Sequence, residues 1–239
     1  MAGLDSRVDV PELIDTAPAS RPSMRRALAF LAFTNRWCGG IRLIVRHLER
    51  WAPRWPAASD TISVLDVGTG TADIPRALVR WARSRGQRLT VTGLDQVAPI
   101  VDLARERVLR YPEITIIRGD LFELAGTPAR YDYVTASLFL HHVEQPRTVA
   151  ALAALSGLAR RGLIVSDLQR TRASWLAVGV AGYVLGNAIV RHDAPLSVRR
   201  AFRTHELAVL ARRAGLDYVT ARTEPWFRLS LAGEKPSAW

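Results

Sequence analysis

The sequence predicts an α/β fold in which a mostly parallel β-sheet is covered by helices. From residue 62 onward, short β-rich apolar runs alternate with segments of helical spacing, and this alternation is typical of parallel sheets. The first run continues into the glycine turn Asp66-Val67-Gly68-Thr69-Gly70, and then into a helix opened by Asp73 and Pro75. A strand that ends in glycines and leads into a helix offers free backbone N–H groups to a ligand.

We predict a seven-stranded sheet, mostly parallel and Rossmann-like, whose last strand is antiparallel. Helices are predicted at about 74–85, 98–110, 146–160 and 204–214; prolines mark two of their starts and glycines follow two of their ends. The strands are predicted at 62–67, 89–94, 114–117, 131–136, 163–166, 218–221 and 226–231.

Two further segments surround this sheet domain, which we assign to residues 59–239. Residues 1–58 are predicted to form a loose polar arm, up to about residue 20, followed by a helical cap broken at Gly39-Gly40. An insertion at 168–203 contains the apolar run 174–190, which is marginal as a membrane span. We interpret that run as a buried cap helix forming the wall of an apolar pocket; a membrane-surface contact or a dimer interface is the alternative.

The composition indicates a globular protein with a basic surface. The chain is 49% hydrophobic and 23% charged, and its net charge of +11 comes almost entirely from scattered arginines. A solvated surface is the simplest explanation, and attraction of an acidic substrate or of RNA are the alternatives. The single cysteine, Cys38, excludes an internal disulfide, and the N-terminus has no secretory pattern, so we expect a cytoplasmic protein.

Acidic or polar residues close each of the first four strands. Asp66 precedes the glycine turn, Asp95 follows the second strand 25 residues beyond Gly70, and Asp120 follows the third. The fourth strand ends in Ser137-Leu138-Phe139-Leu140-His141-His142. Because ligands of open α/β sheets bind at the carboxyl ends of the strands, these residues are expected around one site.

This order of motifs resembles the class I S-adenosylmethionine (SAM)-dependent methyltransferases over about residues 60–230. The closest similarity is to the branch with ubiquinone and menaquinone biosynthesis and polyketide-tailoring enzymes; Ala72 stands where a third glycine is usual. The resemblance implies that the glycine turn meets the methionine part of SAM, Asp95 the ribose, and Asp120 with Leu121 the adenine. The complete cofactor set that we expect is Asp66, Gly68, Thr69, Gly70, Asp73, Asp95, Gln96, Asp120, Leu121 and Ser137.

The resemblance further implies methyl transfer to oxygen or carbon of a small, fairly apolar metabolite that is aromatic, quinone-like or a polyketide. A neutral histidine suits deprotonation of such an acceptor, and His142, then His141, are the candidates; His192 beside Asp193 is a third. The chain lacks the acid and Asp-Asn pair of metal-dependent catechol enzymes, so we expect no metal. Around the acceptor we expect Leu138, Asp167, Tyr183 and Arg191.

Two other functions remain open at this stage. The charge of +11 leaves an RNA methyltransferase or RNA-binding protein as an alternative, and a SAM-fold protein that does not transfer methyl groups, such as a cyclase or a regulator, is another. The sequence leaves open the acceptor, the methylated atom and the choice between monomer and homodimer.

Overall fold

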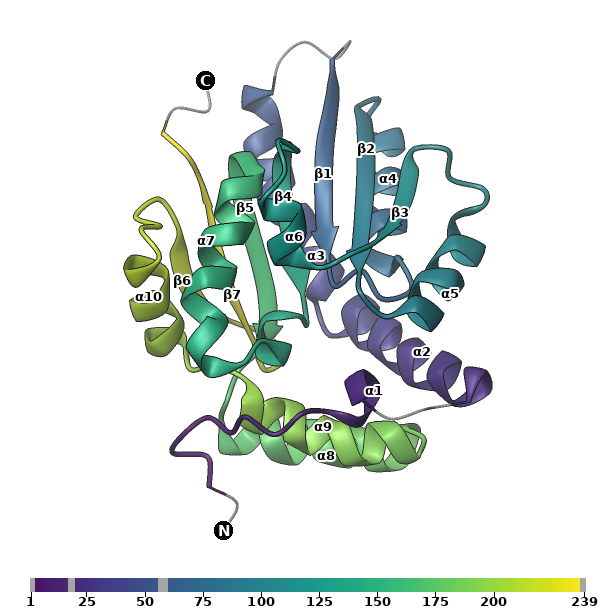
Figure 1. Ribbon diagram of the computed structural model, residues 1–239, viewed down its shortest axis with the longest axis vertical. Coiled ribbons are helices and arrows are strands. Elements are labelled where there is room, and N and C mark those ends of the chain that lie inside the picture. The colour runs from purple at the N-terminus through teal and green to yellow at the C-terminus, as the bar shows by residue number, and fades with distance from the viewer. Residues whose placement is uncertain (1–2, 17–19, 56–59, 237–239) are drawn as a thin grey trace.

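A computed structural model describes residues 3–16, 20–55 and 60–236. Its centre is a seven-stranded sheet in the order β3-β2-β1-β4-β5-β7-β6 (Figure 1). The strands are β1 (Thr61–Val67), β2 (Arg88–Asp95), β3 (Ile114–Arg118), β4 (Tyr131–Ser137), β5 (Ala159–Leu168), β6 (Thr220–Glu224) and β7 (Arg228–Glu234). The first five run parallel, and β7 is antiparallel to both neighbours, as predicted.

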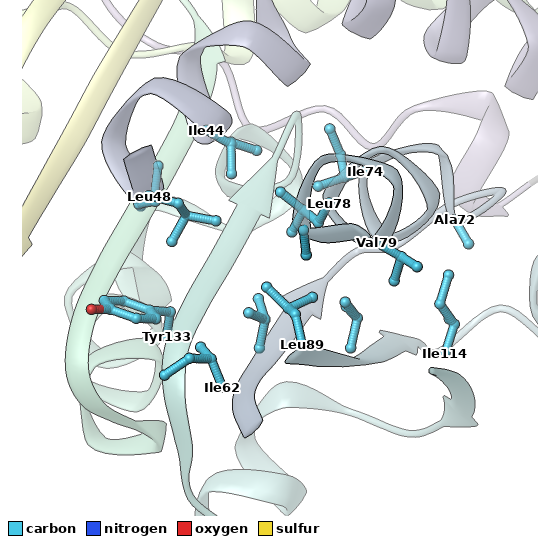
Figure 2. Close-up of a cluster of buried hydrophobic side chains, with 14 of the residues drawn as sticks. Ile44, Leu48, Ile62, Ala72, Ile74, Leu78, Val79, Leu89, Ile114 and Tyr133 are labelled. Atoms are coloured by element: carbon cyan, nitrogen blue, oxygen red, sulfur yellow. The ribbon is translucent and has the colours of Figure 1, made fainter. Parts of the chain in front are cut away.

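Helices cover both faces of the sheet because strand residues alternate between the faces. Val64 of β1 packs into one cluster with α3 (Gly40–Trp51), α4 (Asp73–Ser84) and α5 (Ala98–Val108). Figure 2 shows Ile74, Leu78 and Val79 of α4 in this cluster. Leu65, the next residue along β1, packs on the other face against α7 (Thr148–Leu158) and α10 (Thr204–Arg213).

The predicted bounds differ from the structure by a few residues at several elements, including β6 and β7, which begin two residues later than predicted. The helix predicted to reach residue 160 ends at Leu158, and β5 begins at Ala159 because this stretch pairs with β4, where Ala159 faces Tyr131. A short helix, α6 (Leu121–Ala125), was not predicted; the Asp120 carboxylate starts it by accepting the backbone N–H of Phe122 at 2.7 Å.

The N-terminal arm is not loose over its described residues 3–16. Leu4, Glu12 and Ile14 are buried. A short helix, α1 (Leu13–Thr16), donates the backbone N–H groups of Leu13 and Ile14 to the carboxylate of Asp193. The Val8 N–H donates to the Arg199 carbonyl. The arm is polar, as the sequence indicated. It is nevertheless ordered, because arginines and aspartates of the folded domain bind its backbone. Residues 17–19 and the predicted domain boundary at 58/59 lie outside the described residues.

The predicted single cap helix over 174–190 is two helices. α8 (Arg172–Leu185) ends at Gly186, and Asn187 caps α9 (Ala188–Arg200) by accepting the Val190 N–H. One side of α8 lines a cavity through Ala177, Val178 and Ala181, as predicted for a pocket wall. The opposite side is exposed, with Leu176, Tyr183 and Val184 each more than 60% accessible. Together with α1 and α2 (Arg21–Trp37), the pair lies beyond the carboxyl ends of the strands (Figure 1).

Gly182 sets the spacing between α8 and α9. A Cβ atom at this position would lie 2.5 Å from the Cβ of Ala194, whereas one at Gly179 would meet only Pro195, at 3.9 Å. We therefore expect Gly182→Ala to lower the free energy of unfolding by about 1–3 kcal/mol, because the helices must move apart. The matched variant Gly179→Ala should be neutral or stabilising by about 0.5–1 kcal/mol. Urea unfolding of both variants tests this; equal effects would contradict the assigned packing.

Candidate active site

Two cavities lie side by side at the carboxyl ends of the strands. One, of about 300 Å³, is lined by the glycine turn and the ends of β2 and β3. The other, of about 330 Å³, is lined mainly by apolar side chains of α2, α8 and α9. Four residues line both cavities: Ile14, Leu31, Leu138 and His142. Such adjacent chambers can bring two ligands into contact.

The glycine turn gives the first cavity its shape. Gly68 and Gly70 have φ values of 68° and 54°, which suit glycine, and a Cβ atom at Gly68 would come within 2.7 Å of the Phe139 ring. Ala72 shares the left-handed conformation, with φ at 56°, and is fully buried. The departure from the usual third glycine therefore lies in the core and leaves the cavity unobstructed.

Acidic side chains at the ends of β2 and β3 face this cavity. The Asp95 carboxylate accepts the backbone N–H groups of Gly70 and Val97, both at 3.1 Å, and burial raises its pKa. A carboxylate has about four acceptor positions, so Asp95 can still accept two ligand hydroxyls. Asp120, which caps α6, lines the cavity as well, together with Gln96 and Leu121. The structure thus brings six of the ten expected cofactor residues to one chamber: Gly68, Gly70, Asp95, Gln96, Asp120 and Leu121.

The other four expected cofactor residues support the chamber from behind. Asp66 is buried and accepts hydrogen bonds from the hydroxyls of Thr69 at 2.9 Å and Thr135 at 2.8 Å. Burial raises the pKa of Asp66 to about 7, because desolvation outweighs these hydrogen bonds. Asp66 therefore fixes the turn to β4.

Asp73 and Ser137 meet at a residue that the sequence did not single out. Asn35 of α2 donates to Asp73 at 3.0 Å and accepts from the Ser137 hydroxyl at 3.1 Å. Its carbonyl also accepts a bond from the buried guanidinium of Arg228, at 2.9 Å. This network joins α2 and β7 to the start of α4 and the end of β4. No sequence motif marks Asn35, because its partners lie far away along the chain.

His141, which lines the second cavity, is paired with a buried aspartate. Asp167, fully buried at the end of β5, accepts a hydrogen bond from His141 Nδ1 at 2.6 Å and one from the His141 backbone N–H at 3.0 Å. Burial alone would raise the pKa of Asp167, but His141 and these N–H donors outweigh it and lower the pKa below its ordinary value. Asp167 is therefore ionised and holds the imidazole with Nε2 as the free ring nitrogen.

His142 lies between carboxylates of the N-terminal arm. Its Nδ1 is 2.6 Å from the Asp15 carboxylate, and its Nε2 is 4.0 Å from that of Glu12. Desolvation disfavours the imidazolium, but Glu12 and Asp15 outweigh it and raise the pKa of His142 to about 9. At neutral pH His142 is a cation. Glu12 and Asp15 were missed in the sequence, where they are two acids in a polar segment.

Leu138 separates the two chambers in an unusual conformation. Its φ of 53° lies in the left-handed region, which costs a non-glycine residue about 1–2 kcal/mol, and its N–H donates to the Ser166 carbonyl at 2.8 Å. Strain of this kind is characteristic of functional sites, where the surrounding structure maintains it.

Among the residues predicted for catalysis and for the acceptor, Asp167 is buried behind His141, and three others lie away from both cavities: His192, Tyr183 and Arg191. His192 is half exposed and bonded to Asp193 at 2.8 Å. Tyr183 is 69% exposed, and Arg191 lies over its ring and donates to its carbonyl. Helix periodicity explains the position of Arg191 and His192, because α9 continues through the segment that the sequence suggested as a polar loop. Tyr183 lies on the exposed side of α8.

The comparisons with known proteins agree with this geometry. A family model described as a methyltransferase domain matches residues 64–162. An uncharacterized methyltransferase of Mycobacterium tuberculosis (strain ATCC 25618 / H37Rv) is 31% identical over 157 residues, which are 62% of this chain and 74% of that protein. The chain belongs to the class I SAM-dependent methyltransferases. It is therefore an enzyme that uses SAM, and the predicted family, fold and cofactor are confirmed.

More distant relatives extend the comparison. The demethylmenaquinone methyltransferase of Staphylococcus epidermidis (strain ATCC 12228 / FDA PCI 1200) is 31% identical over 108 residues, which cover 45% of this chain and 43% of that one. Among solved structures, magnesium protoporphyrin IX methyltransferase from Synechocystis PCC 6803, with S-adenosylhomocysteine (SAH) bound, has the same fold. Its TM-score is 0.57 at 18% identity, covering 93% of this chain and 91% of that chain.

No helix in the described part of this methyltransferase is both long and apolar enough to cross a bilayer. The expected cytoplasmic location, the membrane-surface contact and the oligomeric state stay predictions.

The raised pKa of Asp66 predicts a pH effect on stability. Between about pH 4 and pH 7 the folded protein keeps a proton on Asp66 that the unfolded chain has lost, so this residue makes stability fall as pH rises. Asp66→Asn removes that dependence. In thermal melts, the Tm of the variant should therefore rise relative to that of the wild type as pH increases from about 4 to about 7. Parallel pH profiles of Tm for the two proteins would contradict the raised pKa of Asp66. Asp66→Ala should cost about 1–3 kcal/mol, since two buried hydroxyls lose their acceptor.

Asp95 should determine affinity for the ribose of the cofactor. Asp95→Ala is expected to weaken SAH binding by about 10- to 150-fold, which corresponds to about 1.5–3 kcal/mol for a hydrogen bond to a charged group. Calorimetry measures this. As a control for distortion of the Gly70 turn, wild type should prefer adenosine to 2′,3′-dideoxyadenosine, whereas the variant should bind both alike. A variant that keeps the preference would remove Asp95 from this role.

Proposed function

We propose that this enzyme methylates an oxygen or a carbon of a small, fairly apolar aromatic, quinone-like or polyketide acceptor bound in the second cavity, without a metal in the transfer step. The observation that carries this proposal is the buried His141–Asp167 pair at the floor of an apolar chamber that adjoins the cofactor chamber. The demethylmenaquinone relative, whose name gives a quinone precursor as its acceptor, supports the substrate class.

The lining of the cavity favours an acceptor with an extended apolar part. Phe30 and Leu31 of α2, Ala177 and Ala181 of α8, and Trp226 after β6 surround it. Such walls bind by excluding water, at about 25 cal/mol per Å² of apolar surface removed from water. α8 also carries exposed apolar side chains on its opposite side, including Leu176 and Val184, which suits an acceptor with a hydrocarbon tail.

The cofactor supplies an activated methyl group when bound, and the protein's task is to align and deprotonate the acceptor. We propose that Gly68, Gly70, Asp95, Gln96, Asp120 and Leu121 hold the cofactor, and that Leu138 positions its methyl end toward the second cavity. Close alignment of reacting atoms alone can contribute about 7–11 kcal/mol to lowering a barrier.

His141, in place of His142, is the proposed general base. Its Nδ1 is occupied by Asp167, so Nε2 carries the lone pair that can accept the acceptor's hydroxyl proton. The resulting imidazolium would be stabilised by Asp167 and by Glu12, whose carboxylate is 3.6 Å from Nε2. Because His142 is already a cation at neutral pH, it lacks the lone pair that a base needs. Removing a hydroxyl proton activates the oxygen itself and also the ring carbons next to it, so one base serves O- and C-methylation.

His141→Gln should lower kcat by about 10²–10⁴-fold, the usual contribution of a general base, with SAH affinity near that of the wild type. Asp167→Asn should lower kcat too, because it no longer fixes the Nδ1–H tautomer. Turnover is measured as SAH release with a panel of alkylated phenols, hydroquinones and naphthoquinols, with and without EDTA. His205→Gln, on the surface at the start of α10, is the control. Full turnover in His141→Gln would refute the base, and loss of turnover in EDTA would refute metal independence.

A further inference from the structure

Three side chains at the floor of the acceptor cavity have the chemistry of a metal site. Glu12, His141 and His142 each present a ligand atom, and these atoms lie within 4.8 Å of one another. Glu12 Oε1 is 3.6 Å from His141 Nε2, and Glu12 Oε2 is 4.0 Å from His142 Nε2. In a tetrahedral zinc site, bonds of about 2.0–2.1 Å place neighbouring ligand atoms about 3.3 Å apart. Compared with that spacing, the two carboxylate–imidazole distances would shorten by about 0.3 and 0.7 Å, and no pair of ligand atoms by more than about 1.5 Å, which side-chain rotation can supply.

Both histidines are already oriented as metal ligands usually are. His141 Nδ1 is bonded to Asp167 and His142 Nδ1 to Asp15, each at 2.6 Å. A carboxylate on the far ring nitrogen fixes the ring and makes the other nitrogen a better donor. The two Nε2 atoms are left to face the same carboxylate. The two rings are in contact, with centroids 4.3 Å apart and planes tilted by 38°.

Glu12 has an oxygen that the protein itself leaves without a hydrogen bond. Its side chain is 3% exposed, and Oε1 is buried with no hydrogen-bond partner among the described residues. Arg200 Nε lies 3.7 Å away, but it donates to the His141 carbonyl at 2.9 Å instead. The other oxygen, Oε2, accepts from the Ser197 hydroxyl at 2.9 Å. Leaving a buried carboxylate oxygen unpaired is costly, and a cation would satisfy it.

The local charge suits a dication. Three carboxylates, Glu12, Asp15 and Asp167, surround the two imidazoles, and the opposing charges are those of Arg200 and of protonated His142. An ion that binds His142 Nε2 would displace the proton there. All three ligand residues line the acceptor cavity, which leaves the remaining coordination position open to a water molecule or a small ligand.

We propose that Glu12, His141 and His142 form a binding site for one divalent transition-metal ion of the zinc or cobalt type, and that this ion competes with methyl transfer. Imidazole nitrogen with a single carboxylate is a ligand set that prefers such ions over Mg²⁺ or Ca²⁺. The bound ion would use the Nε2 lone pair of His141, and would also fasten the N-terminal arm, through Glu12, across the cavity. Binding rests on the geometry alone; the inhibition rests on the proposed role of His141 as base.

Binding is tested first with the metal alone, on the untagged full chain after chelator treatment. Co²⁺ should give the visible d–d absorption of a four- or five-coordinate ion with nitrogen ligands, saturating at one ion per chain. Zn²⁺ should displace it and raise Tm. Glu12→Gln and His142→Gln should each weaken Zn²⁺ binding by at least about tenfold, and Asp15→Asn by about 10–100-fold, as for other outer-shell carboxylates. His205→Gln should bind like wild type.

Retained SAH binding in each variant shows that it is folded. Absence of a one-to-one Co²⁺ spectrum, or equal loss of affinity in His205→Gln, would overturn the site. The second part is tested with an active acceptor: Zn²⁺ should inhibit wild-type turnover over the same concentrations at which it binds, and EDTA should reverse this. A Zn²⁺-loaded enzyme with undiminished turnover would overturn the competition while leaving the binding site in place. Inactivity of every acceptor would count against the proposed function, whereas the spectrum would still decide the binding.

Discussion

The buried carboxylate of Asp167 is the interaction on which the acceptor site depends. It lies at the end of β5 and accepts three N–H groups, two from His141 and one from Leu168. An ionised group without solvent must be fully paired, so the loop after β4 has little freedom to place His141 elsewhere. One electrostatic requirement therefore fixes the ring orientation, the tautomer and the position of the cavity floor.

Arginine side chains connect this site to the N-terminal arm. Arg200 of α9 donates to the carbonyls of His141 and His142, and Arg7 of the arm donates to the His141 carbonyl. The guanidinium group has five donors in a rigid fork, so each arginine can bind several backbone carbonyls at once. Much of the arginine content that gives the chain its charge is on the surface. Arg7 and Arg200, in contrast, have an internal structural role. Burial lowers the pKa of Arg7 to about 10, at which it remains a cation at neutral pH.

The two chambers differ in the chemical groups that line them. The cofactor chamber is built from strand ends and turns, where backbone N–H groups and carboxylates select a polar ligand. The proposed acceptor chamber is lined mainly by the arm, α2 and the α8–α9 pair, which supply apolar surface. Variation in those helices could change the acceptor without disturbing cofactor binding.

The sequence by itself determined the sheet, the strand-end acids and the cofactor. Those signals are local: each strand is a short apolar run, Gly68 and Gly70 are needed for the backbone of one turn, and Asp95 and Asp120 directly follow their strands. The predicted ends of helices and strands were less exact where strand pairing set them, as at Ala159. The sequence named Leu138, His141 and Asp167 as candidates for the acceptor site, and only the tertiary structure brought them together in the proposed site. Glu12, Asp15, Asn35 and Arg228 become functional candidates through partners up to 193 residues away, as for Arg228 and Asn35. The charge of His142 likewise depends on an arm that reads as polar and unstructured, because the pKa of a buried group is set by what surrounds it in space.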